Sequence, residues 1–425
     1  MLTNLIQNHK STEGKENGQV RRRNHNHNEA KPFVKTGAEE VGNHNKKTIG
    51  LVFISLLLDL LAFTMILPLF PTLLDYYDKQ EGSGSGLYAS LLGCVREFQR
   101  VTGAPDRFAS VLFGGALGSM FSFLQFLASP IVGSLSDAYG RKPLLLVCLF
   151  GIAVSHALWG VARTFPLFVL ARFIGGLSKA NVSLSMAVVT DASNEKTRAR
   201  GMALVGLAFS IGFIVGPLAG AWFALQSANL STGLWGERPA FYALALSVAN
   251  IALVMFCIPE TLPKEKRAPL SFTISRALDF ISPFHLLKFS AVRDLSTKQN
   301  KVLSRLGLIY FLYLFIYSGL EFTITFLTHH TFGYTAMQQG KMFLRLSPYT
   351  SIRCDLECLC VFILSGYCFF LCIVNNVFII LATAFAVSCL TSAAGGHAPA
   401  SSRGAVLGCL RSLGALARAA GPLLL

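Results

Sequence analysis

Long apolar segments recur along the chain, and they constrain its fold more than any other feature. A run of about 18 or more apolar residues has the length of a helix that crosses a membrane. Hydrophobic residues make up 52% of the chain and charged residues only 14%, too few to cover the surface of a soluble protein of this size. We therefore predict an all-α membrane protein with spans at 49–70, 108–132, 143–162, 166–190, 201–224, 239–259, 306–328, 359–374 and 376–394 and a last span starting near Arg403.

Basic residues gather in alternate loops between these spans. The net charge is +15, but the bases do not form the stripe that binds nucleic acid; they follow the positive-inside pattern of membrane proteins. The N-terminus and the 260–305 loop are therefore expected to be cytoplasmic, and Asn229, in a glycosylation pattern, falls in an outer loop. The basic clusters are Lys46 with Lys47, Arg141 with Lys142, 196–200 and 260–305. On the other side, one loop has Arg163 alone, and in 71–107 acidic and basic residues are nearly equal in number.

The segments divide the chain into two halves and two polar regions. Residues 1–48 are rich in Asn, His and Lys and read as a disordered cytoplasmic tail, with no cleavable signal peptide expected before the first span. The segment 200–217 is echoed by 403–422, which indicates two related halves. The other expected parts are a six-helix half at 49–259, a central cytoplasmic loop at 260–305 and an incomplete second half at 306–425.

A short glycine-punctuated segment joins the second and third spans. Its position between two spans predicts a tight turn of about eight residues at the bilayer surface, which the adjacent Arg141 and Lys142 mark as cytoplasmic. The segment has the pattern G-x-L-S-D-x-x-G-R-K. Its glycines, acid and bases are Gly133, Asp137, Gly140, Arg141 and Lys142.

Glycines on the fifth span predict close helix packing. Gly212, Gly216 and Gly220 recur at every fourth position and form a smooth face that another backbone can approach. Pro217 should bend the helix. Together they give the pattern G-x3-G-P-x2-G.

The fourth span carries a lysine near its middle. At about 100° per residue, Arg172, Gly176, Lys179, Ser183 and Thr190 fall within roughly 40° of one line. A lysine at this depth costs about 2.5–3.5 kcal/mol on insertion scales. Lys179 is therefore expected to face a cavity and, with Ser183, to bind substrate, while Arg172 and Gly176 form the element R-x3-G.

Two more bases lie at membrane depth in the last span. Arg411 and Arg418 are seven residues apart and so share a face with Gly414 and Pro422. A guanidinium fork suits carboxylate or phosphonate groups. With Lys179 these arginines favour an anionic substrate; the alternative is that the bases pair with internal acids.

Acids inside the spans are few. Asp59 lies in the middle of the first span, ahead of a Pro-x-x-Pro, and Glu321 lies in the outer half of the seventh. A carboxylate in a membrane cavity can take up and release protons. Both are candidates for proton coupling.

These motifs together resemble the drug/proton antiporter branch of the major facilitator superfamily. The gate-loop pattern at 133–142, R-x3-G at Arg172, the antiporter motif at 212–220 and the acid before Pro-x-x-Pro carry the resemblance, which covers 49–345 and resumes at about 376–422. It implies a fold of two six-helix halves that rock around a midplane site.

The resemblance also implies a function. It implies a multi-pass transporter, acting as a monomer in a plasma or internal membrane, for proton-coupled antiport or efflux of organic anions, anionic drugs included. In the family, the acid of the gate loop, here Asp137, meets the N-terminal end of helix 11 in the outward-facing state, where the helix dipole favours a negative charge.

The second half departs from the family pattern. Residues 344–358 contain a proline and several charges where an eighth span should continue, and the chain ends soon after Gly421 and Pro422. An incomplete second half is expected, and a transport-inactive membrane scaffold is the alternative function. No enzyme is predicted, because catalytic, metal-binding and nucleotide-binding patterns are absent; no cofactor is expected.

Overall fold

The computed structural model describes residues 35–82, 84, 86–103, 109–228, 237–267, 282–290, 292, 295–332, 383 and 385–424. The chain divides into two units, 1–42 and 43–425, and the second holds all the candidate membrane spans of the described chain. The described residues form helices joined by turns and irregular segments, with no strand among them. The prediction of an all-α protein is confirmed.

The described helices of the first half follow one another along the chain. The first span begins in α1 (Lys35–Thr64) and continues through the short helix η1 (Leu67–Leu69) into α2 (Phe70–Glu81). The remaining elements are α3 (Leu87–Thr102), α4 (Ala109–Tyr139), α5 (Arg141–Gly160), α6 (Phe165–Ser178), α7 (Asn181–Asp191), α8 (Glu195–Ala228), α9 (Glu237–Cys257), η3 (Lys264–Lys266), α11 (Pro283–Leu287), α12 (Thr297–Phe332), η5 (Ala400–Ser402) and α15 (Arg403–Leu424), with 385–397 also helical.

Seven helical segments of the described chain are long and apolar enough to cross a membrane. They correspond to the first seven predicted spans. The helix α15 has comparable length but carries Arg403, Arg411 and Arg418. The seven segments are Asn45–Glu81, Leu112–Tyr139, Arg141–Gly160, Phe165–Asp191, Thr197–Phe223, Arg238–Cys257 and Thr297–Leu320.

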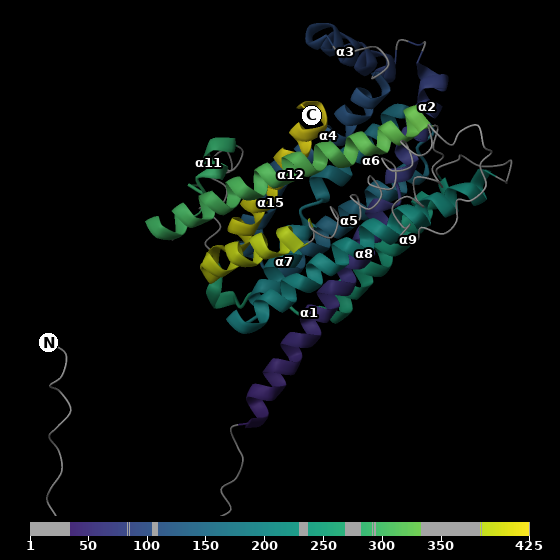
Figure 1. Ribbon diagram of the computed structural model, residues 1–425. Coiled ribbons are helices and arrows are strands. Elements are labelled where there is room, and N and C mark those ends of the chain that lie inside the picture. The colour runs from purple at the N-terminus through teal and green to yellow at the C-terminus, as the bar shows by residue number, and fades with distance from the viewer. Residues whose placement is uncertain are drawn as a thin grey trace, which may run out of the picture. The chain divides into compact units, whose positions relative to one another are not determined.

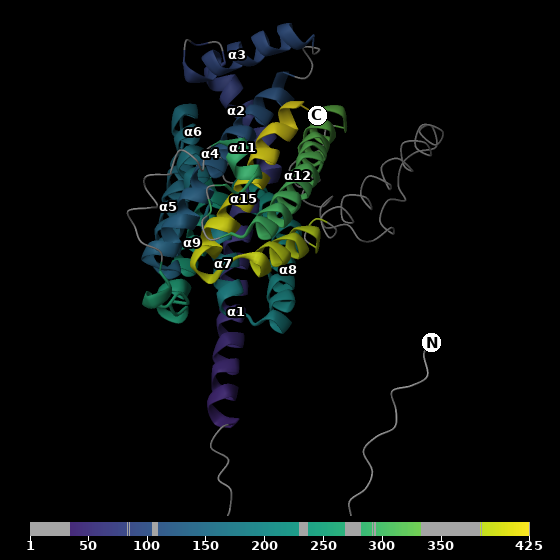
Figure 2. The ribbon, with the colours of Figure 1, turned by 90° about the vertical axis from the view of Figure 1, so that its left-hand side faces the viewer.

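The helix α4 lies at the centre of this arrangement. Its most extensive contact is with α15, so a helix of the first half packs directly on one of the second (Figure 1). The helix α12 covers another side of α15, while α5 packs between α6 and α9 (Figure 2). A core formed by buried side chains of both halves surrounds these contacts.

The turn between the second and third spans is much shorter than predicted. The helix α4 continues to Tyr139 and α5 begins at Arg141, so Gly140 alone reverses the chain. Its φ of 111° lies in a region that residues with a Cβ rarely adopt. A helical α4 therefore holds Gly133 and Asp137 on its last turns instead of in a loop.

The fourth span is broken at its centre, which the prediction of one continuous helix missed. The helix α6 ends at Ser178 and α7 begins at Asn181, with Lys179 between them. The break follows Gly175, Gly176 and Ser178, small residues at which helices commonly kink. The single line of side chains expected from Arg172 to Thr190 is consequently interrupted.

The glycine face of α8 is confirmed. A Cβ at Gly212 would meet Leu60, one at Gly216 would meet Thr64, and one at Gly220 would meet the backbone of Met65. The Thr64 hydroxyl also lies 2.8 Å from the carbonyl oxygen of Gly212. The partner backbone is thus the end of α1, within the first span.

Several predictions fall outside the described residues. They concern residues 1–34 of the predicted disordered tail, Asn229, the segment 344–358, the span at 359–374 and the first part of the span at 376–394. Residues 35–48 of that tail are not disordered as predicted, because they form the first part of the helix α1, which continues into the first span. The backbone of Glu321 lies within α12, but its side chain is also outside the description.

Candidate functional site

The ends of α4 and α15 come into backbone contact through glycine. A Cβ at Gly133 would collide with the backbone of Gly404, and one at Gly408 would collide with the carbonyl of Ser129. Side chains of ordinary size would separate the two helices. The absence of side chains therefore allows the first and second halves to close tightly at this end.

Asp137 binds the N-terminus of α15 at this contact. Its carboxylate accepts hydrogen bonds from the backbone N–H groups of Gly404 at 3.0 Å and Ala405 at 2.8 Å. The first N–H groups of a helix lack partners within the helix, and the helix dipole favours an anion there. The contact that the family resemblance implied for Asp137 is present.

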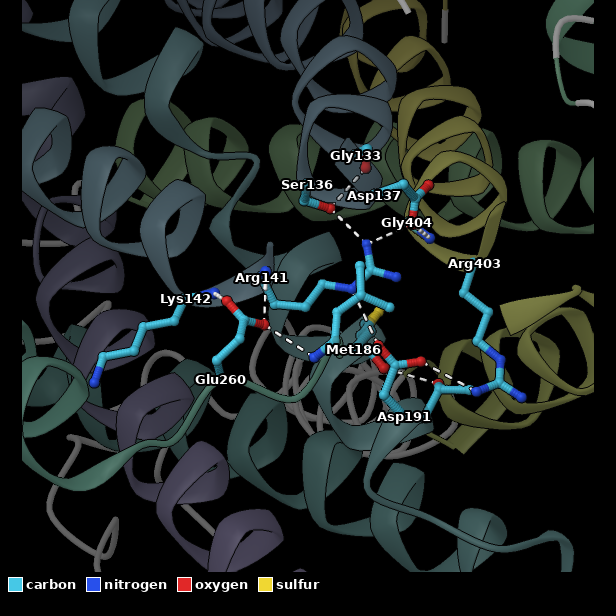
Figure 3. A network of polar contacts seen from close by, with 12 residues as sticks. Gly133, Ser136, Asp137, Arg141, Lys142, Met186, Asp191, Glu260, Arg403 and Gly404 are labelled. Atoms are coloured by element: carbon cyan, nitrogen blue, oxygen red, sulfur yellow. Dashed lines mark hydrogen bonds and ion pairs between the residues drawn. The ribbon is translucent and has the colours of Figure 1, made fainter. Parts of the chain in front are cut away.

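Arg141 connects Asp137 to a second acid. Its guanidinium lies 2.6 Å from Asp137 and donates from Nε to Asp191 at 3.1 Å. Asp191 in turn accepts from Arg403 at 3.1 Å. These four charges come from α4, α5, α7 and α15, and Figure 3 shows them together. We call Asp137, Arg141, Asp191 and Arg403 the gate network.

Burial changes the interpretation of the Arg141 and Lys142 pair. The Arg141 side chain is 0% exposed and belongs to a buried network, whereas Lys142 reaches the exposed carbonyl of Met255 at 2.8 Å; the cytoplasmic side assigned from this pair stays a prediction. A buried guanidinium is stable only with charged partners and hydrogen bonds. Asp137, Asp191 and the Ser136 hydroxyl supply them.

Glu260 caps the helix that carries Arg141. Its two carboxylate oxygens accept from the N–H groups of Arg141 at 3.0 Å and Lys142 at 3.1 Å. A carboxylate at a helix N-terminus satisfies backbone donors and interacts favourably with the dipole. Glu260 thereby fixes the start of α5 and the direction in which Arg141 points.

A cavity of about 220 Å³ lies among helices of both halves. Four bases line it, and no acid does so among the lining residues that the structure describes. The rest of the lining is mainly apolar and rich in aromatic rings. The bases are Arg172, Lys179, Arg411 and Arg418, and the rings are Phe63, Phe70, Phe121, Phe209, Phe213 and Tyr317.

Lys179 is paired with Asp59 directly behind the cavity wall. The ammonium donates to Oδ2 of Asp59 at 2.8 Å and lies 4.5 Å from the centre of the Phe63 ring. Both side chains are buried. Oδ1 of Asp59 has no hydrogen-bond partner among the described residues. The predicted substrate ligand and the predicted proton carrier therefore form one ion pair.

Aromatic rings and neutral groups surround the arginines. Arg172 lies 5.4 Å from the centre of the Phe121 ring, at a distance typical of cation–π contacts. Arg411 donates to the Tyr310 hydroxyl at 3.3 Å and lies 5.3 Å from the Phe209 ring. Nε of Arg172 and Nε of Arg411 are buried without a partner in the described part of the chain.

Gln125 links the second half to the break in the fourth span. Its amide N–H donates to the carbonyl of Lys179 at 3.1 Å, a carbonyl next to the helix break. Its Oε1 accepts from Arg418 at 2.9 Å. A carbonyl needs a donor and a guanidinium needs an acceptor, so these partners fix the orientation of the amide.

The structure brings some predicted residues together and separates others. Arg411, Arg418 and Pro422 line the cavity, whereas Gly414 faces Tyr310. Ser183 is not among the described lining residues. It lies in α7, beyond the helix break, and its hydroxyl donates to the carbonyl of Ala180.

Sequence reasoning missed Asp191, Gln125 and the role of Glu260. Asp191 could have been noticed as an acid directly after an apolar segment, and Gln125 as an amide inside one. Their partners lie 50 residues away or more along the chain, so no local spacing indicates them.

Comparison with known proteins identifies the family. The Major Facilitator Superfamily matches residues 52–348. The chain belongs to this superfamily of membrane transporters. It is 42% identical over 406 residues to human (Homo sapiens) major facilitator superfamily domain-containing protein 10, a match that covers 89% of this chain and 86% of that protein.

The solved structure of this human protein and one further relative agree with the fold and the family. The crystal structure of the human organic anion transporter MFSD10 (TETRAN) superposes with a TM-score of 0.72 and 40% identity, covering 89% of this chain and 92% of that one. The class C tetracycline resistance protein of Escherichia coli is 28% identical over 170 residues, 40% of each chain. The predicted facilitator fold is confirmed.

The buried pair predicts strong coupling between Asp59 and Lys179. Asp59→Leu or Lys179→Met alone should lower the free energy of unfolding by about 3–5 kcal/mol, because each leaves an unpaired buried charge. The double variant should lose much less than the sum. Thermal unfolding of the purified protein measures all three.

The exposed pair of Glu97 and Arg100 provides the control. Its two charges are 2.8 Å apart but largely solvent-exposed, so Glu97→Leu and Arg100→Met should each change stability by less than about 1 kcal/mol. Additive losses at Asp59 and Lys179 would show that the two side chains are not paired.

Proposed function

We propose that this protein carries organic anions across a membrane by alternating access. The cavity lining carries the proposal: it has four bases and no acid among its described residues. Buried cations are stabilised by an anion of matching geometry. Similarity to a human organic anion transporter, of which this chain covers 92%, supports the same substrate class.

The substrate's negative group is proposed to bind Arg411 and Arg418, with Lys179 nearby. Arg411 has an unpartnered Nε within the described chain. Arg418 is held by a neutral amide at Gln125. The apolar part of the substrate would lie against the rings of Phe209 and Phe213, which also face the cavity. This combination suits amphipathic anions, including anionic drugs.

The gate network is proposed to hold the cavity closed at one end. Asp137 satisfies two buried N–H groups of α15, a contact that exists only while the two halves are together at this end. Opening must therefore break it.

The basic loops beside this end support a cytoplasmic orientation of both the gate and the N-terminus. Labelling of Ser296→Cys by an impermeant thiol reagent outside intact cells would contradict that orientation.

Transport is proposed to be coupled to protons through Asp59, with Glu321 as a second candidate and antiport as the mode. The glycine and proline pattern of α8 supports antiport. The ion pair sets a condition on it: a proton on Asp59 would free Lys179 for an anion, so proton and anion would favour each other there. Antiport of a proton and an anion therefore requires the anion to bind Arg411 and Arg418 while Asp59 remains ionised and paired with Lys179.

Flux measurements with matched probes test the substrate class. In proteoliposomes, the flux of benzenesulfonate should exceed that in protein-free liposomes. The flux of neutral benzenesulfonamide should be the same with and without the protein. Arg411→Gln and Arg418→Gln should each weaken apparent affinity for the sulfonate roughly 10–100-fold, because a hydrogen bond to a charged group contributes about 1.5–3 kcal/mol.

The exposed Arg163 offers a control with the same chemistry. Arg163→Gln should leave the flux of benzenesulfonate unchanged, since this residue is not part of the cavity lining. Equal protein-dependent flux of the sulfonate and the sulfonamide, or unaltered apparent affinity for the sulfonate in both cavity variants, would refute the proposal.

The sign of an imposed pH gradient tests the coupling. Antiport predicts that benzenesulfonate accumulates in vesicles with an acidic interior, because protons leave as the anion enters. Asp59→Asn should abolish this accumulation while leaving exchange between labelled and unlabelled sulfonate. Accumulation driven instead by an acidic exterior would mean that proton and anion move together, which excludes antiport but not anion transport.

A further inference from the structure

The helix α3 lies at the end of the protein opposite the gate network. It begins six residues after α2 ends at Glu81, and α4 begins at Ala109, seven residues after α3 ends. The helix α4 then runs from this end to the gate. Figures 1 and 2 both show α3 across the end of the bundle. Because both neighbours are membrane spans, α3 is held at the level of the membrane surface.

One face of α3 packs on the protein. Tyr88, Leu92, Val95 and Gln99 are buried along it. The Tyr88 ring lies 4.8 Å from that of Phe113 in α4, centre to centre. Burial, aided by nearby carboxylates, raises the pKa of the Tyr88 hydroxyl, which is hydrogen-bonded to Asp78 of α2. The helix is therefore fixed in its rotation about its own axis.

A second face is apolar and mostly exposed, with Leu91 partly packed against the core. Its residues recur at intervals of three and four, as on one side of a helix. Exposure reaches 42% for Phe98 and 79% for Val101. We call this set, Leu87, Leu91, Cys94, Phe98 and Val101, the apolar stripe.

A third face is polar. Gly93, Arg96, Glu97 and Arg100 are exposed along it, and Arg100 pairs with Glu97 at 2.8 Å. At about 100° per residue, the apolar stripe and the polar face lie roughly 110–120° to opposite sides of the buried face. The helix thus has one side for protein, one apolar side and one side for water.

We propose that α3 is an interfacial membrane helix whose apolar stripe inserts into the leaflet opposite the gate. A helix at the level of the membrane surface that packs on the protein with one face can have lipid on a second side and water on a third, which is the division that α3 shows. Amphipathic helices at such interfaces bury apolar side chains at the headgroup boundary and keep basic groups in water. Arg96 and Arg100 are exposed on the polar face, on the side that this arrangement leaves to water.

The bilayer fits the apolar stripe better than a second protein does. Lipid is present wherever the spans are inserted, and α3 is attached to a span on either side. The apolar stripe and the polar face lie to opposite sides of the buried face. Lipid on one side and water on the other therefore account for both faces without a second protein. The proposal is independent of what the cavity binds.

Fluorescence quenching in lipid nanodiscs tests the proposal on the purified full chain. An environment-sensitive dye is attached to single cysteines in a variant whose other cysteines are replaced. Two probes lie on the apolar stripe, native Cys94 and Val101→Cys, and two lie on the polar face, Arg96→Cys and Arg100→Cys. Stripe probes should lose quenching by aqueous iodide and gain quenching by lipid nitroxides near the headgroup; polar-face probes should show the reverse.

The alternatives give different patterns. Equal iodide quenching on both faces would show that α3 stands in water, and shielding of the apolar stripe from both quenchers would indicate protein contact with a second copy. Either result would overturn the proposal. Thermal unfolding of each labelled variant confirms that it is folded, and having two probes on each face guards against a local disturbance at one site.

Discussion

The contact between Asp137 and the N-terminus of α15 is the interaction on which the rest of the structure depends. Gly404 and Ala405 present N–H groups that have no acceptor inside their own helix, and the buried carboxylate of Asp137 accepts both. Arg141 compensates the buried charge, and Asp191 extends the network to Arg403. The contact is possible only because glycines let α4 and α15 approach closely. Sterics and electrostatics therefore close the same end of the protein.

Closure at the gate leaves a cavity above it in which positive charge prevails. Lys179 is compensated by Asp59, while Arg172 and Arg411 lie against aromatic rings that balance a cation only weakly. Gln125 connects the two halves at this cavity, because it accepts a hydrogen bond from Arg418 and donates one to the carbonyl of Lys179 at the helix break. An anion that draws Arg418 away from Gln125 would disturb both halves at once. Such a link would let substrate binding influence the gate, which is what alternating access requires.

Part of the fold and of the site could be predicted from the sequence. Local patterns placed the first seven spans, the glycine face of α8 and the contact of Asp137, because each depends on spacing within one helix or on a motif. The pairing of Asp59 with Lys179 joins residues 120 positions apart, and spacing within a helix cannot reveal it. The break at Lys179 was missed since no proline marks it, and the assumed continuous helix then placed Ser183 wrongly in the cavity. The burial and pairing of Arg141 could not be predicted, because its partner Asp191 lies on another helix.

A distance measurement across the gate tests the central claim most directly. Spin labels at Ala199→Cys in α8 and Lys298→Cys in α12 are exposed and lie at the gate end of opposite halves. Pulsed electron paramagnetic resonance on the chain in nanodiscs should give mainly a short distance, and Asp137→Asn should shift the population to longer distances because a neutral amide binds the α15 N-terminus less strongly. An unchanged distance distribution in Asp137→Asn would contradict the claim that this carboxylate holds the two halves together.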